Sequence, residues 1–136
     1  MYASSKVTLL LVDDESQILD SLSTILTAAG YQCCMAANEE TAMRLASEVD
    51  PDLIISDINL AGQSGLELCE RLKQQALTKD VPVMFVSGAQ VPDIIRRAHA
   101  AGGTYYLRKP FDPEVLLELV DKALWMPHLS NQLERV

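Results

Sequence analysis

Short runs of consecutive apolar residues alternate along the chain with longer segments in which apolar residues recur every three or four positions. An unbroken apolar run that stops abruptly is typical of a strand buried on both faces of a parallel sheet. Apolar residues at intervals of three and four indicate a helix with one buried face. We expect five strands, over Val7–Val12, Tyr31–Ala36, Leu53–Ser56, Val81–Val86 and Thr104–Leu107.

A helix is expected after each strand, because residues that begin or end helices flank the periodic segments. Regular alternation of strand and helix predicts a parallel sheet with helices on both faces. The boundary residues are Gly30 after the first helix, Asn38 before the second, Gly65 at the start of the third, Pro92 at the start of the fourth, and Asp112 and Pro113 at the start of the fifth.

The length and charge of the chain limit its class. It has 136 residues, with 11 lysines and arginines against 19 aspartates and glutamates, so its net charge is −8. This length suits one domain, which we expect over 6–125, and the polar residues 126–136 are expected to form a tail or the start of a linker. An acidic chain repels phosphates, so direct nucleic acid binding is not expected.

The cysteines and the apolar segments bear on the compartment. The chain has three cysteines, Cys33, Cys34 and Cys69, and no Cys-x-x-Cys motif. The odd number and the absence of this motif argue against a structural disulfide. Neighbours in a strand, such as Cys33 and Cys34, point to opposite faces of the sheet. No apolar stretch approaches the ~20 residues that span a bilayer. We therefore expect a cytoplasmic protein without a membrane segment.

Polar and charged side chains follow the expected strands. Asp13 and Asp14 end the first strand, Asp57 the third and Ser87 the fourth, and Lys109 comes after the fifth. Ligands of open α/β sheets bind beyond the carboxyl ends of the strands, where these groups would converge. Crowded carboxylates need a cation, and oxygen ligands without histidine or cysteine favour Mg²⁺. Together with a lysine and a hydroxyl they would cradle a phosphoryl group, which a carboxylate can accept covalently.

With these residues in place, the sequence resembles the receiver domain of bacterial two-component response regulators, the CheY-like family. The resemblance runs from about Lys6 to Leu124. It implies a flavodoxin-like (βα)5 doubly wound parallel sheet with strand order 2-1-3-4-5. The motifs that carry it are Leu11–Glu15, Ile54–Leu60, Gly65, Val86–Ala89 and Tyr105–Phe111.

The resemblance also implies a chemistry for the site. Asp57 would accept a phosphoryl group from the phosphohistidine of a histidine kinase or a histidine phosphotransfer protein. Mg²⁺ would be held by Asp14 directly, by Asp13 through water, by Asp57, and by the backbone carbonyl of Asn59. Lys109 would pair with Asp57 and then with the phosphoryl oxygens. Such a chain is not a classical enzyme, although it promotes its own phosphorylation and dephosphorylation.

A switch and its partners follow from the same resemblance. Ser87 would move to hydrogen-bond the phosphoryl group, and Tyr106 would turn inward with it. This change would bias a surface of the domain toward a partner or a second copy of the chain. A homodimer would use the fourth helix, fifth strand and fifth helix. The Lys109–Pro110 bond is expected to be cis. Because Tyr105 points away from Tyr106, one of the two should be packed and the other exposed.

Three positions depart from the commonest family pattern: Asn59, Ala61 and Ser87 stand where methionine, proline and threonine are frequent. None of these changes removes a reactive group. The sequence leaves two alternatives. The same fold binds flavin or nucleotide, although Asp13 and Asp14 stand where a glycine-rich phosphate loop is needed. The chain could also be a phosphorylation-independent interaction module on a receiver scaffold.

Overall fold

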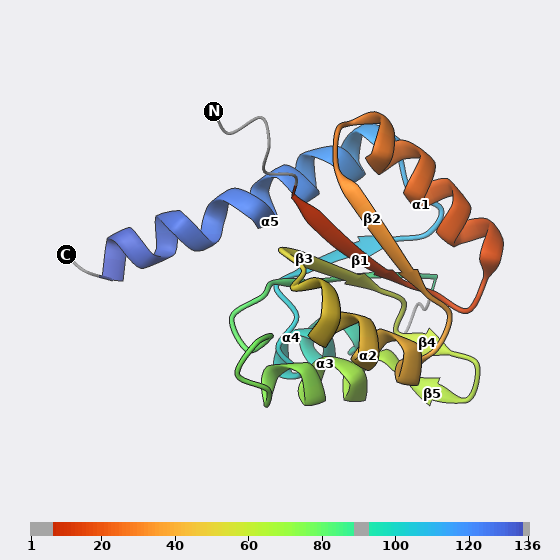
Figure 1. The fold of residues 1–136 in the computed structure, drawn as a ribbon, viewed down its shortest axis with the longest axis horizontal. Coiled ribbons are helices and arrows are strands. Elements are labelled where there is room, and N and C mark those ends of the chain that lie inside the picture. Colours follow the sequence, from red (N-terminus) through yellow and green to blue (C-terminus); the bar gives the residue numbers. More distant parts are fainter. Residues whose placement is uncertain (1–6, 89–92, 135–136) are drawn as a thin grey trace.

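Within residues 7–88 and 93–134, which the computed structural model describes, five parallel strands form one sheet in the order β2-β1-β3-β6-β7 (Figure 1). A separate antiparallel pair, β4 and β5, lies between β3 and α3 in the chain. Without that pair, the order is the expected 2-1-3-4-5, so the predicted fold is confirmed. The strands are β1 (Thr8–Val12), β2 (Gln32–Ala36), β3 (Leu53–Ser56), β4 (Asn59–Leu60), β5 (Gln63–Ser64), β6 (Val83–Ser87) and β7 (Tyr105–Arg108).

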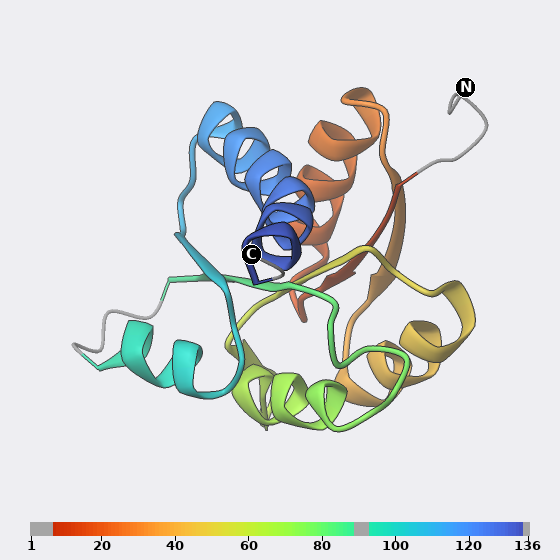
Figure 2. The ribbon, with the colours of Figure 1, turned by 90° about the vertical axis from the view of Figure 1, so that its left-hand side faces the viewer.

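The helices cover both faces of the sheet. Figures 1 and 2 show α1 and α5 on one face, and α2, α3 and α4 on the other. This arrangement follows from parallel strands joined by crossover helices. The helices are α1 (Ser16–Ala28), α2 (Glu39–Val49), α3 (Gly65–Lys73), α4 (Ile94–Ala100) and α5 (Pro113–Glu134). No helix in the described part of the chain is both long and apolar enough to span a bilayer.

Two hydrophobic cores lie on the two faces of the sheet. Leu9 and Leu11 of β1 pack with α1 and α5, whereas Leu10 and Val12 pack with α2, α3 and α4. Successive strand residues point to opposite faces, so one unbroken apolar run supplies both cores. The same rule separates Cys33 from Cys34, as expected, and all three cysteines are free.

Most helix ends agree with the sequence-based expectations. The Asn38 side chain accepts a hydrogen bond from the Thr41 amide at 2.8 Å, and Asp112 accepts one from Glu114 at 2.8 Å. Each satisfies an amide that the first turn of a helix leaves unpaired. Gly30 follows α1 with a φ of 101°, which a residue without a side chain adopts at little cost. The expected start at Pro92 lies outside the described residues.

Helix α5 and strand β6 differ most from expectation, whereas the ends of the other expected strands lie within one residue of their predicted positions. Helix α5 continues to Glu134, so the stretch 126–136 expected as a polar tail or linker is helical over most of its length. The leucines, Gln132 and Glu134 of this stretch are good helix formers, whereas Pro127 and the histidine, serine and asparagine among them are not. Strand β6 begins at Val83 instead of Val81, because the Val81 amide donates to the Thr78 carbonyl in a turn. The strand includes Ser87, which pairs with Arg108 of β7.

Candidate functional site

Asp13 and Asp57 lie side by side at the carboxyl edge of the sheet. Strands β1 and β3 pair in parallel with Val12 opposite Ser56, so the next residue of each strand is at the same level. The Asp57 amide donates to the Val12 carbonyl at 2.9 Å, and the Asp13 amide to Ala36 at 3.1 Å. Asp13 is 1% and Asp57 6% exposed. Two carboxylates are therefore held, nearly buried, beside each other.

Lys109 follows β7, the strand at one edge of the sheet, and its side chain reaches both of these carboxylates. Its Nζ lies 2.8 Å from Asp13 Oδ2 and 2.9 Å from Asp57 Oδ2, with Glu15 Oε1 at 3.5 Å. The Lys109 amide donates to the Ser87 carbonyl at 2.9 Å, which extends the pairing of β7 with β6 past the strand end. Because Nζ bridges two aspartates from separate strands, the ammonium links three segments that are distant in sequence.

The site holds more negative than positive charge. The ligand oxygens of Asp13, Asp14, Glu15 and Asp57 all lie within 4.8 Å of one another, and in the described part of the chain the ammonium of Lys109 is the cation paired with them. Burial raises the pKa of Asp13, and its hydrogen bonds with Lys109 and the Glu15 amide offset this only in part. Burial alone would lower the pKa of Lys109, but its bonds to Asp13 and Asp57 outweigh that effect and raise it. An added cation would relieve this repulsion.

Backbone amides orient the aspartates of this acidic cluster. Asp13 Oδ1 accepts from the Glu15 amide at 2.9 Å, and Asp57 Oδ1 accepts from the Asn59 amide at 3.1 Å. Asp14 Oδ2 accepts from the Ala61 amide at 3.1 Å. A carboxylate has more acceptor sites than these bonds occupy. The cluster therefore offers hard oxygen donors of the kind that Mg²⁺ binds, and these residues fit that ion.

The two expected switch residues lie on neighbouring strands. Ser87 ends β6, is 1% exposed, and pairs across the sheet with Arg108 of β7. Tyr106 lies opposite Phe85 and packs, half-buried, against the core formed with α2, α3 and α4. Tyr105 is also half-buried, against the other core. The expectation that one of the tyrosines is exposed was wrong, because helices cover both faces beside β7.

The loop after Asp57 holds features that side-chain patterns did not reveal. It folds into the β4–β5 hairpin, with Asn59 opposite Ser64, and presents the Ala61 amide to Asp14. Every residue type except proline carries a backbone N–H group, so the sequence does not indicate which amide contacts Asp14. Glu15 also belongs to the cluster, and its sequence signal is its position directly after Asp13 and Asp14.

Gly65 is required where this loop returns to α3. An added Cβ at Gly65 would lie 2.0 Å from the Asp57 carbonyl oxygen, well inside contact distance. The Gly65 amide donates to the Ile58 carbonyl at 2.6 Å, which holds the two segments together. We expect Gly65→Ala to lower the free energy of unfolding by about 2–4 kcal/mol. Urea unfolding followed by circular dichroism measures this, with Gly88→Ala as the control, and an unchanged midpoint would contradict it.

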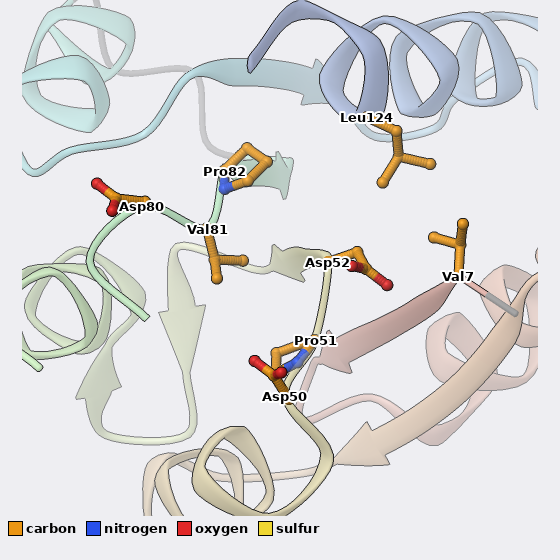
Figure 3. Close-up of a pocket in the computed structure, with 8 residues that line it drawn as sticks. All are labelled: Val7, Asp50, Pro51, Asp52, Asp80, Val81, Pro82 and Leu124. Carbon is orange, nitrogen blue, oxygen red and sulfur yellow. The ribbon is translucent and has the colours of Figure 1, made fainter. Parts of the chain in front are cut away.

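A hollow lies at the opposite, amino edge of the sheet, away from the acidic cluster (Figure 3). It has a volume of about 380 Å³, and Figure 3 shows Val7 and Leu124 pointing toward each other across it. Asp52 is tied there to the Thr8 amide at 2.9 Å. Among the described residues that line it, aspartates are present and lysine and arginine are not, so the negative charge would repel a phosphoryl group. The lining residues are Val7, Asp50, Pro51, Asp52, Asp80, Val81, Pro82 and Leu124.

Comparison with known proteins agrees with this geometry. The family model of the response regulator receiver domain matches residues 9–121. The chain is 37% identical over 117 residues to the phosphate regulon transcriptional regulatory protein PhoB of Pseudomonas aeruginosa. The aligned region covers 86% of this chain and 51% of that protein. It is 28% identical to sporulation initiation phosphotransferase F of Bacillus subtilis, over 90% of this chain and 96% of that one.

A solved structure shares both fold and sequence. The chemotaxis protein CheY4 of Vibrio cholerae superimposes with a TM-score of 0.84 at 32% identity, over 88% of this chain and 100% of that one. The chain therefore belongs to the response regulator receiver domain family of two-component systems. It spans about half the length of the curated PhoB relatives that it matches.

Proposed function

We propose that this chain is a phosphorylation-controlled switch in which Asp57 accepts a phosphoryl group from the phosphohistidine of a histidine kinase or histidine phosphotransfer protein. The observation that carries the proposal is the Lys109 ammonium at 2.8 Å from Asp13 and 2.9 Å from Asp57, at the carboxyl edge of the sheet. Membership of the receiver family supports the same assignment.

The transfer follows from the groups present. A carboxylate oxygen of Asp57 attacks phosphorus, an O–P bond forms, and the N–P bond of the phosphohistidine breaks. The imidazole leaves with the electron pair of that bond and takes up a proton. Lys109, held beside Asp57, stabilises negative charge on the phosphoryl oxygens. Dephosphorylation removes the phosphoryl group by hydrolysis. Water attacks phosphorus, the O–P bond to Asp57 breaks, and the Asp57 carboxylate is restored as inorganic phosphate leaves.

The metal belongs to the same proposal. Asp13, Asp14 and Asp57, with the backbone carbonyl of Asn59, would hold Mg²⁺. When bound, the ion supplies positive charge that offsets the carboxylates and the phosphoryl oxygens. The chain itself orients the ligands, because its backbone amides hold the aspartates in place before any ion binds. Fixed donors and acceptors avoid the cost of reorganisation during transfer.

The response would pass through Ser87 and Tyr106 to the surface formed by α4, β7 and α5. Ser87 is buried beside β7, so its movement would disturb the packing of that strand. This surface would bind a downstream partner or a second copy of the chain, with the receiver domain spanning 6–125. Free cysteines support a reducing, cytoplasmic location.

Beryllofluoride tests the proposal, because it imitates a phosphorylated aspartate only where carboxylate, metal and lysine act together. We expect saturable, Mg²⁺-dependent shifts of the amide NMR signals of Asp57, Ser87 and Tyr106 in the wild-type chain. Asp57→Asn should show none of them, while keeping the dispersed spectrum of a folded protein. A folded wild-type chain that does not respond would favour the alternative, an interaction module that works without phosphorylation.

A further inference from the structure

The β4–β5 hairpin connects two carboxylates of the acidic cluster. Asn59, at its start, donates its amide to Asp57 Oδ1 at 3.1 Å. Ala61, at its tip, donates its amide to Asp14 Oδ2 at 3.1 Å. Asp14 and Ala61 are separated by 47 positions in the sequence, so the second bond exists only in the folded chain. The hairpin thus contacts the cluster at two points.

Asp14 depends on this contact more than its neighbours do. Asp13 and Asp57 are almost buried, and each is bound by Lys109. Asp14 is exposed, and among the described residues its hydrogen-bond partner is the Ala61 amide. An exposed carboxylate rotates freely unless something holds it, and ordering it later costs free energy. The rotamer that Ala61 holds is the one that brings Asp14 within 4.8 Å of the other carboxylates.

The other arm of the hairpin is anchored to the body of the domain. The Gln63 side chain accepts a hydrogen bond from the Glu39 amide, at the first residue of α2, at 3.1 Å. Arg71 of α3 forms an ion pair with Glu39 at 3.0 Å. Ser64 then caps α3, accepting from the Leu66 amide at 3.2 Å. The tip that carries the Ala61 amide is therefore fixed from β5, and the amide has a defined direction.

We propose that the Ala61 backbone amide is a positioning group for the divalent cation, and that Gln63 supports it by anchoring the hairpin. The bond to Oδ2 leaves Oδ1 of Asp14 available to a metal ion. The ion then meets a carboxylate that is already oriented, so less free energy is spent on ordering during binding. This inference rests on the proposed function, since it assumes that the acidic cluster is the Mg²⁺ site.

Ala61→Pro tests the inference, because proline has no amide hydrogen to donate. Ala61→Ser is the matched control, since it keeps the donor at an exposed position. Mg²⁺ affinity of each metal-free protein is measured by titration followed with amide NMR, with no phosphoryl donor present. We expect affinity to fall about 3- to 10-fold in Ala61→Pro, the value of one hydrogen bond, and to stay within about 2-fold in Ala61→Ser.

Gln63→Met provides an independent variant that keeps the Ala61 amide but removes the anchor of β5. We expect it to weaken Mg²⁺ binding about 2- to 3-fold, in the same direction as Ala61→Pro. Unfolding midpoints of the metal-free variants separate loss of positioning from loss of fold. Wild-type affinity in a folded Ala61→Pro chain overturns the inference, and so does wild-type affinity in Gln63→Met if Ala61→Pro does not fold. A wild-type chain that binds no Mg²⁺ would instead remove the proposed metal site itself.

Discussion

Replacing Asp57 with asparagine is expected to lower the rate of phosphoryl uptake at least about 100-fold. Asparagine has nearly the same shape, but its amide is a poor nucleophile and does not form an acyl phosphate. Asp57 is the carboxylate bound at once by Lys109 at 2.9 Å and by the Asn59 amide at 3.1 Å. Its removal therefore takes away the attacking group and leaves the surrounding donors in place.

The measurement is incorporation of labelled phosphate from acetyl phosphate with Mg²⁺, scored as the fraction that hydroxylamine releases, since acyl phosphates react with it. Asp20→Asn, on the exposed side of α1, is the matched control and should label like the wild type. Labelling of Asp57→Asn at the wild-type rate would show that another residue accepts the phosphoryl group. The acidic neighbours Asp13 and Asp14 would then be the next residues to replace.

Replacing Lys109 with methionine is expected to have two effects, one on transfer and one on stability. The side chain is 12% exposed, and its ammonium is bound to Asp13 and Asp57. Without it, two nearly buried carboxylates face each other with no positive charge between them, although their backbone amide donors remain. We expect phosphoryl uptake to fall about 100-fold, and the free energy of unfolding of the metal-free protein at neutral pH to fall by about 2–4 kcal/mol.

The pH dependence of this loss has a defined sign. The pKa of Lys109 is raised above its ordinary value of 10.5, so in the wild type the stabilisation by its charge is complete below that pH and is lost only above it. The pKa of Asp13 is raised too, so the cost of its negative charge is absent at low pH and grows as the pH rises through that pKa. Without Lys109 this cost increases. The difference between Lys109→Met and wild type should therefore shrink as the pH falls from about 7 to about 4.

Urea unfolding of metal-free protein across this pH range measures the effect. Lys109→Arg, which keeps the positive charge, is the matched control and should retain more of the stability than of the transfer rate, because a guanidinium has a different geometry. A Lys109→Met chain with wild-type stability at every pH would mean that the ammonium does not pair with Asp13 and Asp57 in solution. Wild-type phosphoryl uptake in that variant would remove Lys109 from the proposed mechanism.

The fold and the reactive side chains were open to prediction because each has a local cause. An apolar run that stops at a polar or charged residue marks the end of a buried strand, and Asp13, Asp57 and Ser87 each stand at such an end. Parallel strands bring their carboxyl ends to one edge, so these residues were expected to meet there. Asn38 and Asp112 cap their helices as expected, because a cap involves residues only two or three positions apart.

Other features depend on groups that are distant in sequence or that belong to the backbone. Tyr105 and Tyr106 are both half-buried because helices cover both faces of the sheet beside β7, which no neighbouring residue specifies. The continuation of α5 to Glu134 runs through Pro127 and a polar segment, so residue type did not indicate it. The bond from the Ala61 amide to Asp14 has a donor that every residue type except proline carries.

The sequence by itself determined the kinds of groups at the site and the strand ends on which they lie. Residue type and local periodicity are properties of the chain before it folds. The tertiary structure alone decided which groups touch: that Lys109 bridges Asp13 and Asp57, and that the hairpin tip holds Asp14. Such contacts form only when the entropy lost on closing long loops is offset by the free energy gained on burying the two cores. Their geometry is therefore a property of the whole domain.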